Sequence, residues 1–228
     1  MSLQVRDASV GYGGTEVLRN VTLTVPRGRV VALLGANGAG KTTLLRMCSG
    51  LLPASRGEVL VDGVDVTHAS PATLNKRGLC HIPEGRAIFP ALTVLENLRL
   101  MGGDDAVERA ADAFPQLGQR LKQAAGTMSG GEQQMLALTR AYLTNPDFVL
   151  LDEVSMGLAP IIVDTIFDFL RRLADRGTAL LIVEQYVAKA LGLADIAYIL
   201  HKGALVFCGE PAELDTDALA HSYLGVHS

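Results

Sequence analysis

Eight residues, GANGAGKT from Gly35 to Thr42, match the spacing G-x-x-x-x-G-K-[ST] that is typical of loops that bind nucleoside phosphates. Glycines allow backbone conformations in which successive N–H groups converge on an anion, and a following helix N-terminus adds positive potential. We expect Lys41 to reach the β- and γ-phosphates, and the Thr42 hydroxyl to serve Mg²⁺. The predicted nucleotide contacts are Gly35, Ala36, Asn37, Gly38, Ala39, Gly40, Lys41, Thr42 and Thr43.

Two adjacent carboxylates end a later apolar segment, FVLLDE, at Asp152 and Glu153. Ligands of open α/β sheets bind outside the carboxyl ends of the strands, so we expect both side chains beside the phosphate loop. Asp152 can hold Mg²⁺ through water, because this ion prefers oxygen ligands. Glu153 can orient and polarise the water molecule that attacks the γ-phosphate. An acidic pair after a strand is more often a helix cap or a solvated edge, and the phosphate loop reverses that preference.

A third segment, MSGGEQQMLALTRAYL, begins with Ser129, Gly130 and Gly131 and continues with a helical pattern. Serine is a favourable N-cap, and the positive end of a helix dipole attracts anions. A cap needs only the serine, whereas two consecutive glycines lower the stability of a helix. The glycines therefore predict a second place where a phosphate approaches the backbone closely.

Two kinds of strand pattern surround these motifs. Continuous apolar runs predict buried parallel strands, and they lie at 29–34, 148–151 and 179–183. Alternation of apolar and polar residues around glycine turns predicts antiparallel strands, as at 3–10, 16–25, 57–66 and 196–209. The sequence thus predicts an α/β core beside an antiparallel part.

Helical patterns fill most of the remaining chain. Segments 42–52 and 161–177 are placed between predicted parallel strands, so we expect them to be crossover helices. A separate helical portion is predicted between about Ala91 and Tyr142, from the segments 92–101, 104–114 and 131–143. We find no internal repeat or low-complexity linker.

Composition excludes several classes of protein. With 228 residues, 49% of them hydrophobic, and a formal net charge of -4, we expect one large globular domain or two subdomains. The apolar runs are far shorter than the roughly 18 residues of a membrane-spanning helix. The first residues lack the features of an export signal, so we expect a cytoplasmic location. Cys48, Cys80 and Cys208 are too scattered for a disulfide framework or zinc site, and no basic run indicates nucleic acid.

Together the motifs resemble those of the ATP-binding subunits of ABC transporters, over nearly the whole chain. The phosphate loop is similar to the Walker A motif, FVLLDE to Walker B, and SGGEQ to the signature that distinguishes this family. The resemblance implies ATP and Mg²⁺ as ligands. It also implies a dimer in which Ser129, Gly130, Gly131 and Glu132 contact the ATP held by the other subunit. Tyr12, which alone would be read as a half-buried strand residue, falls where the family stacks an aromatic on adenine.

The same resemblance implies an α/β P-loop NTPase fold of the ABC-ATPase type, with a RecA-like core, an antiparallel β subdomain and an inserted helical subdomain. Residues 1–228 are then a single ABC ATPase domain. Within it, 1–83 and 148–228 are expected to form the nucleotide-binding core with its antiparallel part. Residues 84–147 are expected to form the Q-loop and the helical subdomain that carries the signature.

Two positions depart from the family pattern. In HIPEGRAIFP, Glu84 stands where the Q-loop usually has glutamine; its carboxylate can ligate Mg²⁺ but adds negative charge and cannot donate a hydrogen bond unless protonated. Gln185 stands where the family usually has a histidine; its amide can donate to the γ-phosphate but does not titrate. Alternatively, Glu84 is a solvated loop acid and Gln185 a helix cap. A regulatory protein without activity also remains open.

The segments PEGR, MSGGEQQM, SMGLAP, VEQ and the terminal YLG resemble the ATPases of branched-chain amino-acid importers, although Val154 replaces the proline usual after Walker B. The implied partners are a paralogous ATPase or a second copy, two membrane permeases and an extracytoplasmic amino-acid-binding protein. The implied location is the inner face of the cell membrane. Alternatives are the same role for urea or short amides, and a non-transport ABC ATPase.

Overall fold

The computed structural model describes residues 1–85, 87–103 and 105–214. Within these residues the core is a six-stranded sheet with the order β10-β9-β3-β8-β7-β6. Neighbouring strands are parallel except for the terminal hairpin of β9 and β10. The strands are β3 (Val30–Leu34), β6 (Leu79–Ile82), β7 (Phe148–Asp152), β8 (Ala179–Val183), β9 (Ile196–His201) and β10 (Ala204–Gly209).

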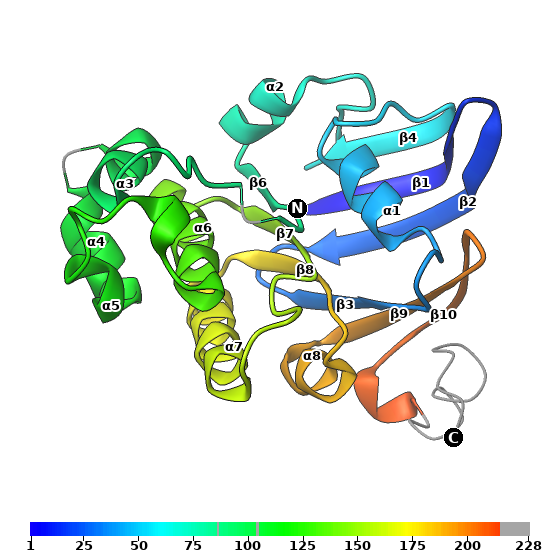
Figure 1. Cartoon of the computed structure of the whole chain (residues 1–228). Helices are drawn as coiled ribbons and strands as arrows, with labels where there is room; N and C mark the ends of the chain where they lie inside the picture. Colours follow the sequence, from blue (N-terminus) through cyan, green and yellow to red (C-terminus); the bar gives the residue numbers. More distant parts are fainter. Residues whose placement is uncertain (86, 104, 215–228) are drawn as a thin grey trace.

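A second, antiparallel sheet lies beside the core, with the strand order β2-β1-β4-β5 in the described chain (Figure 1). The turn at Asp62-Gly63 has positive φ at both residues, as a two-residue hairpin requires. The sheet is also tied to the core, because the Arg19 N–H donates to the Gly203 carbonyl at 2.8 Å. The strands are β1 (Ser2–Tyr12), β2 (Thr15–Pro26), β4 (Arg56–Val61) and β5 (Val64–Asp65).

The helices occupy three places. Helix α1 (Lys41–Cys48) lies between the two sheets, and α2 (Pro71–Lys76) precedes β6. Helices α7 (Pro160–Asp175) and α8 (Val187–Leu193) pack against the same face of the core sheet. The remaining four gather at one side of the molecule, as Figure 1 shows: α3 (Val94–Gly102), α4 (Ala106–Ala113), α5 (Pro115–Gly118) and α6 (Gly130–Thr144).

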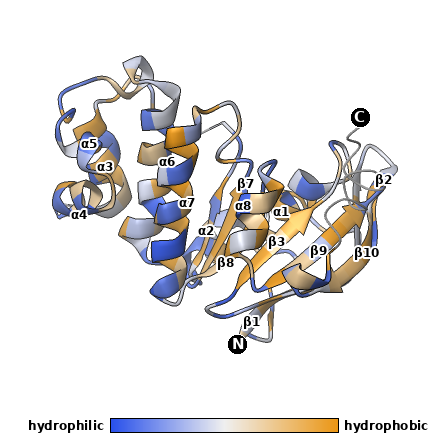
Figure 2. Cartoon of the chain, turned by 90° about the horizontal axis from the view of Figure 1, so that it is seen from below, coloured by the Kyte–Doolittle hydropathy of each residue, from blue (hydrophilic) through white to orange (hydrophobic). Residues whose placement is uncertain are grey.

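Alternation along the buried strands gives the core sheet two apolar faces. One face, with Leu150 and Leu181, packs against α1 and the antiparallel sheet. The opposite face, with Val149, Leu151 and Ile182, belongs to a cluster that continues into α3, α4, α6 and α7. The hydropathy colouring of Figure 2 shows strands of the core sheet, such as β3 and β9, as hydrophobic. The helical part and the sheet therefore share one continuous core.

Polar contacts also join the helical part to α7. The Tyr142 hydroxyl contacts Asp112 and accepts from Arg176, whose guanidinium lies 4.1 Å from the centroid of the Tyr142 ring. Arg172 donates to the Ala113 carbonyl at 2.6 Å. These contacts reinforce the apolar packing of α4 and α6 against α7.

The elements expected from the hydrophobic pattern are present, with some differences. The helix expected at 42–52 ends at Cys48, because Gly50 has φ +71°. Helices α2 and α8 and strand β6 were not expected, being only four to seven residues long. No helix in the described ranges is long and apolar enough to span a membrane. Arg86 in the PEGR segment and the terminal YLG lie outside the described residues.

Candidate nucleotide site

The phosphate loop connects the buried strand β3 to α1. Lys41 is only 7% exposed, and its Nζ donates to the carbonyl oxygens of Gly35 and Ala36, at 2.8 and 3.1 Å. Burial lowers the pKa of Lys41, while the charges of Glu153 and Asp152 act in the opposite direction. The ammonium thus lies over the loop, with two carboxylates close enough to act on it.

Two glycines of the loop are required by the backbone. Gly40, the N-cap of α1, has φ +110°, and a Cβ there would lie 2.6 Å from Leu18 Cδ2. A Cβ on Gly35 would lie 2.3 Å from the carbonyl oxygen of Leu200. Any side chain at either position would collide with β2 or β9, so the loop conformation depends on glycine.

Thr42 and Asp152 meet across the end of the sheet. The Thr42 hydroxyl donates to Asp152 Oδ1 at 3.1 Å. Burial raises the pKa of the Asp152 carboxyl; the charges of Glu153 and Glu84 add to this, and the hydrogen bond from Thr42 opposes it. Two further carboxylates therefore help to raise the pKa of Asp152 beside the first turn of α1, which favours a cation there.

Glu153 directly follows β7 and has φ +48°, an unusual backbone conformation for a residue with a side chain. Its N–H donates to the Val183 carbonyl at 2.8 Å, and its Oε2 accepts from Gln185 Nε2 at 3.2 Å. The same amide nitrogen lies 3.3 Å from the sulfur of Met156. The carboxylate and the amide are thus held as a pair at the ends of β7 and β8.

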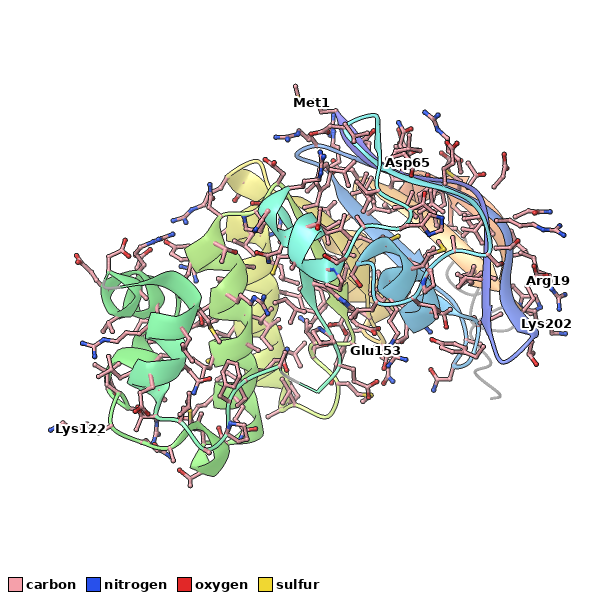
Figure 3. All side chains as sticks on the ribbon, turned by 90° about the horizontal axis from the view of Figure 1, so that it is seen from above. Met1, Arg19, Asp65, Lys122, Glu153 and Lys202 are labelled. Carbon is pink, nitrogen blue, oxygen red and sulfur yellow. The ribbon has the colours of Figure 1, made fainter. Side chains whose placement is uncertain are left out.

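A cavity of about 370 Å³ brings most of these side chains together. Glu153 lies between the helical part and α1 in Figure 3. A second cavity of about 440 Å³, between the helical part and the loop after β7, shares Glu84, Glu153 and Met156 with the first. The first cavity is lined by Val17, Asn37, Gly38, Gly40, Lys41, Thr42, Thr43, Glu84, Glu153, Met156 and Gln185.

The donor set fits an ion that shares its ligands with a phosphate. Among the described residues no three His, Cys, Asp or Glu side chains gather as a metal-binding cluster of their own. The hydroxyl and carboxylate of the Thr42–Asp152 pair are oxygen donors next to the phosphate loop. Mg²⁺ usually takes one or two protein ligands and completes its shell with water and substrate phosphates, so this pair suits it.

The signature residues do not line the cavity of their own phosphate loop. Ser129 is the N-cap of α6, and it forms a reciprocal capping box with Glu132, which also pairs with Arg120 at 2.6 Å. A Cβ on Gly131 would lie 2.8 Å from Ile162 Cγ2 in α7. Packing against α7 therefore explains a glycine at position 131 within this chain. The sequence alone suggests only the close approach of a phosphate as the reason.

Tyr12 also lies outside the lining of that cavity. It ends β1, is 45% exposed, and pairs with Thr15 across the β1–β2 turn. Val17 on the next strand is the residue of this sheet that reaches the cavity. The Tyr12 side chain is thus open to solvent beside the β1–β2 turn.

Two polar residues near the site were not expected to act there. Asn97 is fully buried; its side chain accepts from the Phe89 N–H at 2.9 Å and donates to the carbonyls of Phe89 and Thr93. Asn97 thereby fixes the backbone at Phe89, five residues after Glu84. Glu184, 4% exposed, accepts from the N–H and hydroxyl of Ser155. The sequence did contain one sign of a special role for Glu184, because an acidic residue directly follows the apolar run 179–183.

The fold and the site define the chain as a P-loop nucleotide-binding protein, with a phosphate loop, a Thr–Asp pair and a second glycine-rich helix start. The description "ABC transporter" belongs to the family model that matches residues 18–156. The chain therefore belongs to the ABC transporter family, and the resemblance seen in its sequence is confirmed.

Similar proteins agree with this family. The chain is 42% identical to the high-affinity branched-chain amino acid transport ATP-binding protein BraG of Pseudomonas aeruginosa, over 95% of this chain and 97% of BraG. It is 36% identical to the probable branched-chain amino acid transport ATP-binding protein LivF of Archaeoglobus fulgidus, over 90% and 91%. A crystal structure of an ATP-binding cassette of an ABC transporter in its ADP conformation superposes with a TM-score of 0.84, at 27% identity over 97% and 96%. The expected ABC-ATPase fold is thereby confirmed.

Proposed function

We propose that this chain is the ATP-hydrolysing subunit of an ABC importer that takes up the branched-chain amino acids leucine, isoleucine and valine. The observation that carries the ATPase is the convergence of Lys41, Thr42, Glu153 and Gln185 on one cavity. The identity of 42% with BraG over nearly the whole chain supports the transported solute.

Hydrolysis needs a water molecule in line with the γ-phosphate and a group that accepts its proton. Glu153 fills this role, since its carboxylate faces the cavity and is held by Gln185. Lys41 exchanges its two carbonyl contacts for the β- and γ-phosphates of ATP and stabilises the charge on the transferred group. Gln185 donates to the γ-phosphate in place of the usual histidine.

Thr42 and Asp152 hold Mg²⁺ in this proposal, with Glu84 as a further oxygen ligand. The hydrogen bond between Thr42 and Asp152 and the effect of the Glu84 charge on the pKa of Asp152 support this set. When bound, the ion neutralises phosphate charge, and the buried Asp152 carboxylate is then paired with a cation.

A second subunit completes each site. The N-terminus of α6, from Ser129 to Glu132, lines no wall of the cavity in its own chain. The capping box uses the N–H groups of Ser129 and Glu132, so the backbone N–H groups of Gly130 and Gly131 are the ones that serve a nucleotide held by another subunit. Tyr12 stacks on the adenine ring. The partner is a paralogous ATPase or a second copy of this chain, as in the resemblance drawn from the sequence.

The permease side of the protein is the groove beside the Glu84 segment. A groove of about 500 Å³ lies between α2 and the residues on both sides of Glu84, lined in part by Leu51, Ala72, Pro83 and Ala87. Leu51 is 57% exposed there, and Phe89 in the same segment is 54% exposed. Two membrane permeases bind on this side, and an extracytoplasmic binding protein delivers the amino acid. The chain itself works at the inner face of the membrane.

The proposal is tested by uptake of labelled leucine and, separately, labelled urea in cells of the source organism. One strain carries Glu153→Gln in place of the natural chain, and a matched strain carries Glu58→Gln, at an exposed position on β4. Loss of the general base lowers the hydrolysis rate by roughly 10²-fold or more, so leucine uptake should fall to background in the first strain alone.

Loss of urea uptake alone would keep the mechanism and replace the solute. Unchanged uptake of both solutes by the Glu153→Gln strain would contradict the importer function and favour a non-transport ABC ATPase. Co-purification with nucleic acid in place of membrane proteins would point in the same direction.

A further inference from the structure

A buried contact lies directly behind the exposed pair of Glu153 and Gln185. Glu184 is 4% exposed and Ser155 is fully buried. Glu184 Oε1 accepts from the Ser155 N–H at 3.0 Å, and Glu184 Oε2 accepts from the Ser155 hydroxyl. One side chain thereby fixes both the backbone and the side chain of a residue in the loop after β7.

This contact continues the pairing of β7 and β8 beyond the end of the sheet. The last ladder pair is Asp152 with Val183, and the Glu153 N–H donates to the Val183 carbonyl at 2.8 Å. Glu184 then holds Ser155, two residues further along. Glu153 is thus fixed on both sides, by Val183 before it and by Ser155 after it.

The backbone of Glu153 needs such support. A φ of +48° in a residue with a Cβ costs roughly 1–2 kcal/mol, and it persists only where the surroundings determine it. If Ser155 were released, the loop could relax to an ordinary conformation, and the Glu153 carboxylate would leave its place beside Gln185.

Stability alone is a weak reason for this pair. Burial raises the pKa of the Glu184 carboxyl, the two contacts with Ser155 lower it, and the charge of Glu153 raises it further. Replacing buried ionic groups by apolar residues of similar volume is often neutral or stabilising. A buried carboxylate next to the catalytic pair is therefore better explained by what it positions.

We propose that Glu184 and Ser155 are positioning residues for ATP hydrolysis, which hold the Glu153 carboxylate in register with Gln185 at the γ-phosphate. This inference rests on the ATPase function proposed above. Neither side chain lines the cavity, so neither is expected to contribute to the affinity for ATP.

The test measures kcat for ATP hydrolysis and the Kd of a non-hydrolysable ATP analogue for Ser155→Ala and Glu184→Gln. Ser155→Ala should lower kcat roughly ten- to hundred-fold, the cost of misplacing a reacting group by about 1 Å, with little change in Kd. Glu184→Gln should retain most of kcat, because its amide can accept from the Ser155 N–H and donate to the Ser155 hydroxyl.

Thr67→Ala is the matched control. Thr67 is 8% exposed, and its N–H and hydroxyl both donate to Asp65 Oδ1, at 2.9 and 2.6 Å. Thr67 follows β5, its hydroxyl also accepts from the Val59 N–H at 2.9 Å, and it does not line the cavity. The same kind of hydroxyl contact is therefore removed beside the antiparallel sheet. This variant should lose stability while its kcat stays within about twofold of the natural chain.

Several outcomes would overturn the inference. They are an unchanged kcat in Ser155→Ala, a Kd that rises in parallel with the loss of kcat, or an equal loss in Thr67→Ala. Absence of hydrolysis in the natural chain would instead overturn the proposed function and this inference with it. Ser155→Ala removes a single oxygen atom. If this variant fails to fold, Glu184→Gln provides the test, because a large loss of kcat in the folded Glu184→Gln protein would contradict the expectation that it retains most of kcat.

Discussion

Gly131→Ala separates two reasons for a glycine at the start of α6. A Cβ there would lie 2.8 Å from Ile162 Cγ2 and 3.2 Å from Ile162 Cγ1. Overpacking of this kind costs roughly 1–3 kcal/mol, whereas replacing Gly by Ala within a helix gains roughly 0.5–1 kcal/mol. The free energy of unfolding should therefore fall by about 1 kcal/mol, and by at most about 2.5 kcal/mol.

The destabilising effect of Gly131→Ala should disappear or reverse once the Ile162 side chain is shortened. Ile162→Ala deletes both Cγ atoms that the new Cβ would meet. In that background only the helical gain remains, so adding Gly131→Ala should leave stability unchanged or raise it by up to about 1 kcal/mol. Urea unfolding of the natural chain, the two single variants and the double variant completes the cycle.

A stable Gly131→Ala protein, or the same loss in both backgrounds, would refute the packing argument. The glycine would then be left with the explanation drawn from the sequence, a close approach of phosphate to the backbone. Hydrolysis by the folded double variant addresses that second reason directly, because the steric conflict is absent from it.

Two further predictions concern single side chains. Burial and the charge of Arg46 lower the pKa of His81 from 6.5 to about 4, so the unfolded chain binds the proton more readily. His81 therefore does not lower the free energy of unfolding above pH 6.5. As the pH falls from 6.5 towards 4, protonation of His81 in the unfolded chain lowers this free energy by at most about 3 kcal/mol. His81→Leu should remove this part of the pH dependence, which unfolding curves recorded at several pH values would show. Glu84→Ala should weaken Mg²⁺-dependent ATP binding and lower transport. Glu84→Gln keeps a carbonyl oxygen and should therefore weaken binding less. Unchanged binding and transport in Glu84→Ala would show that the metal assignment is wrong.

Much of the nucleotide site could be predicted because its chemistry is local in sequence. The phosphate loop follows a buried strand, and Asp152 and Glu153 end another, so the continuous apolar runs and the motif spacing place both at one sheet edge. The meeting of Thr42 with Asp152 follows from parallel topology. These are the features that hydrophobic patterns predict best.

The remaining features depend on contacts between distant segments. The pairing of Glu184 with Ser155 appears only when β7 and β8 lie side by side, and the conflict between Gly131 and Ile162 only when α6 meets α7. The short elements α2 and β6 have too few residues to show a period, although Ser70 caps α2 and Pro71 opens it. The hydrophobic pattern alone therefore predicts neither kind of feature.

The continuous apolar cluster also limits how such a domain can be recombined. The buried residues of α3, α4 and α6 belong to the same cluster as Val149 and Leu151 of β7 and Phe169 of α7. A graft of 84–147 from a relative would have to match this shared surface, or the recipient would expose the apolar faces of its sheet and α7. In sequence the helical part lies between β6 and β7, yet its buried apolar residues share one cluster with β7 and α7. Substitutions on its outer surface would therefore disturb the fold less than an exchange of the whole part.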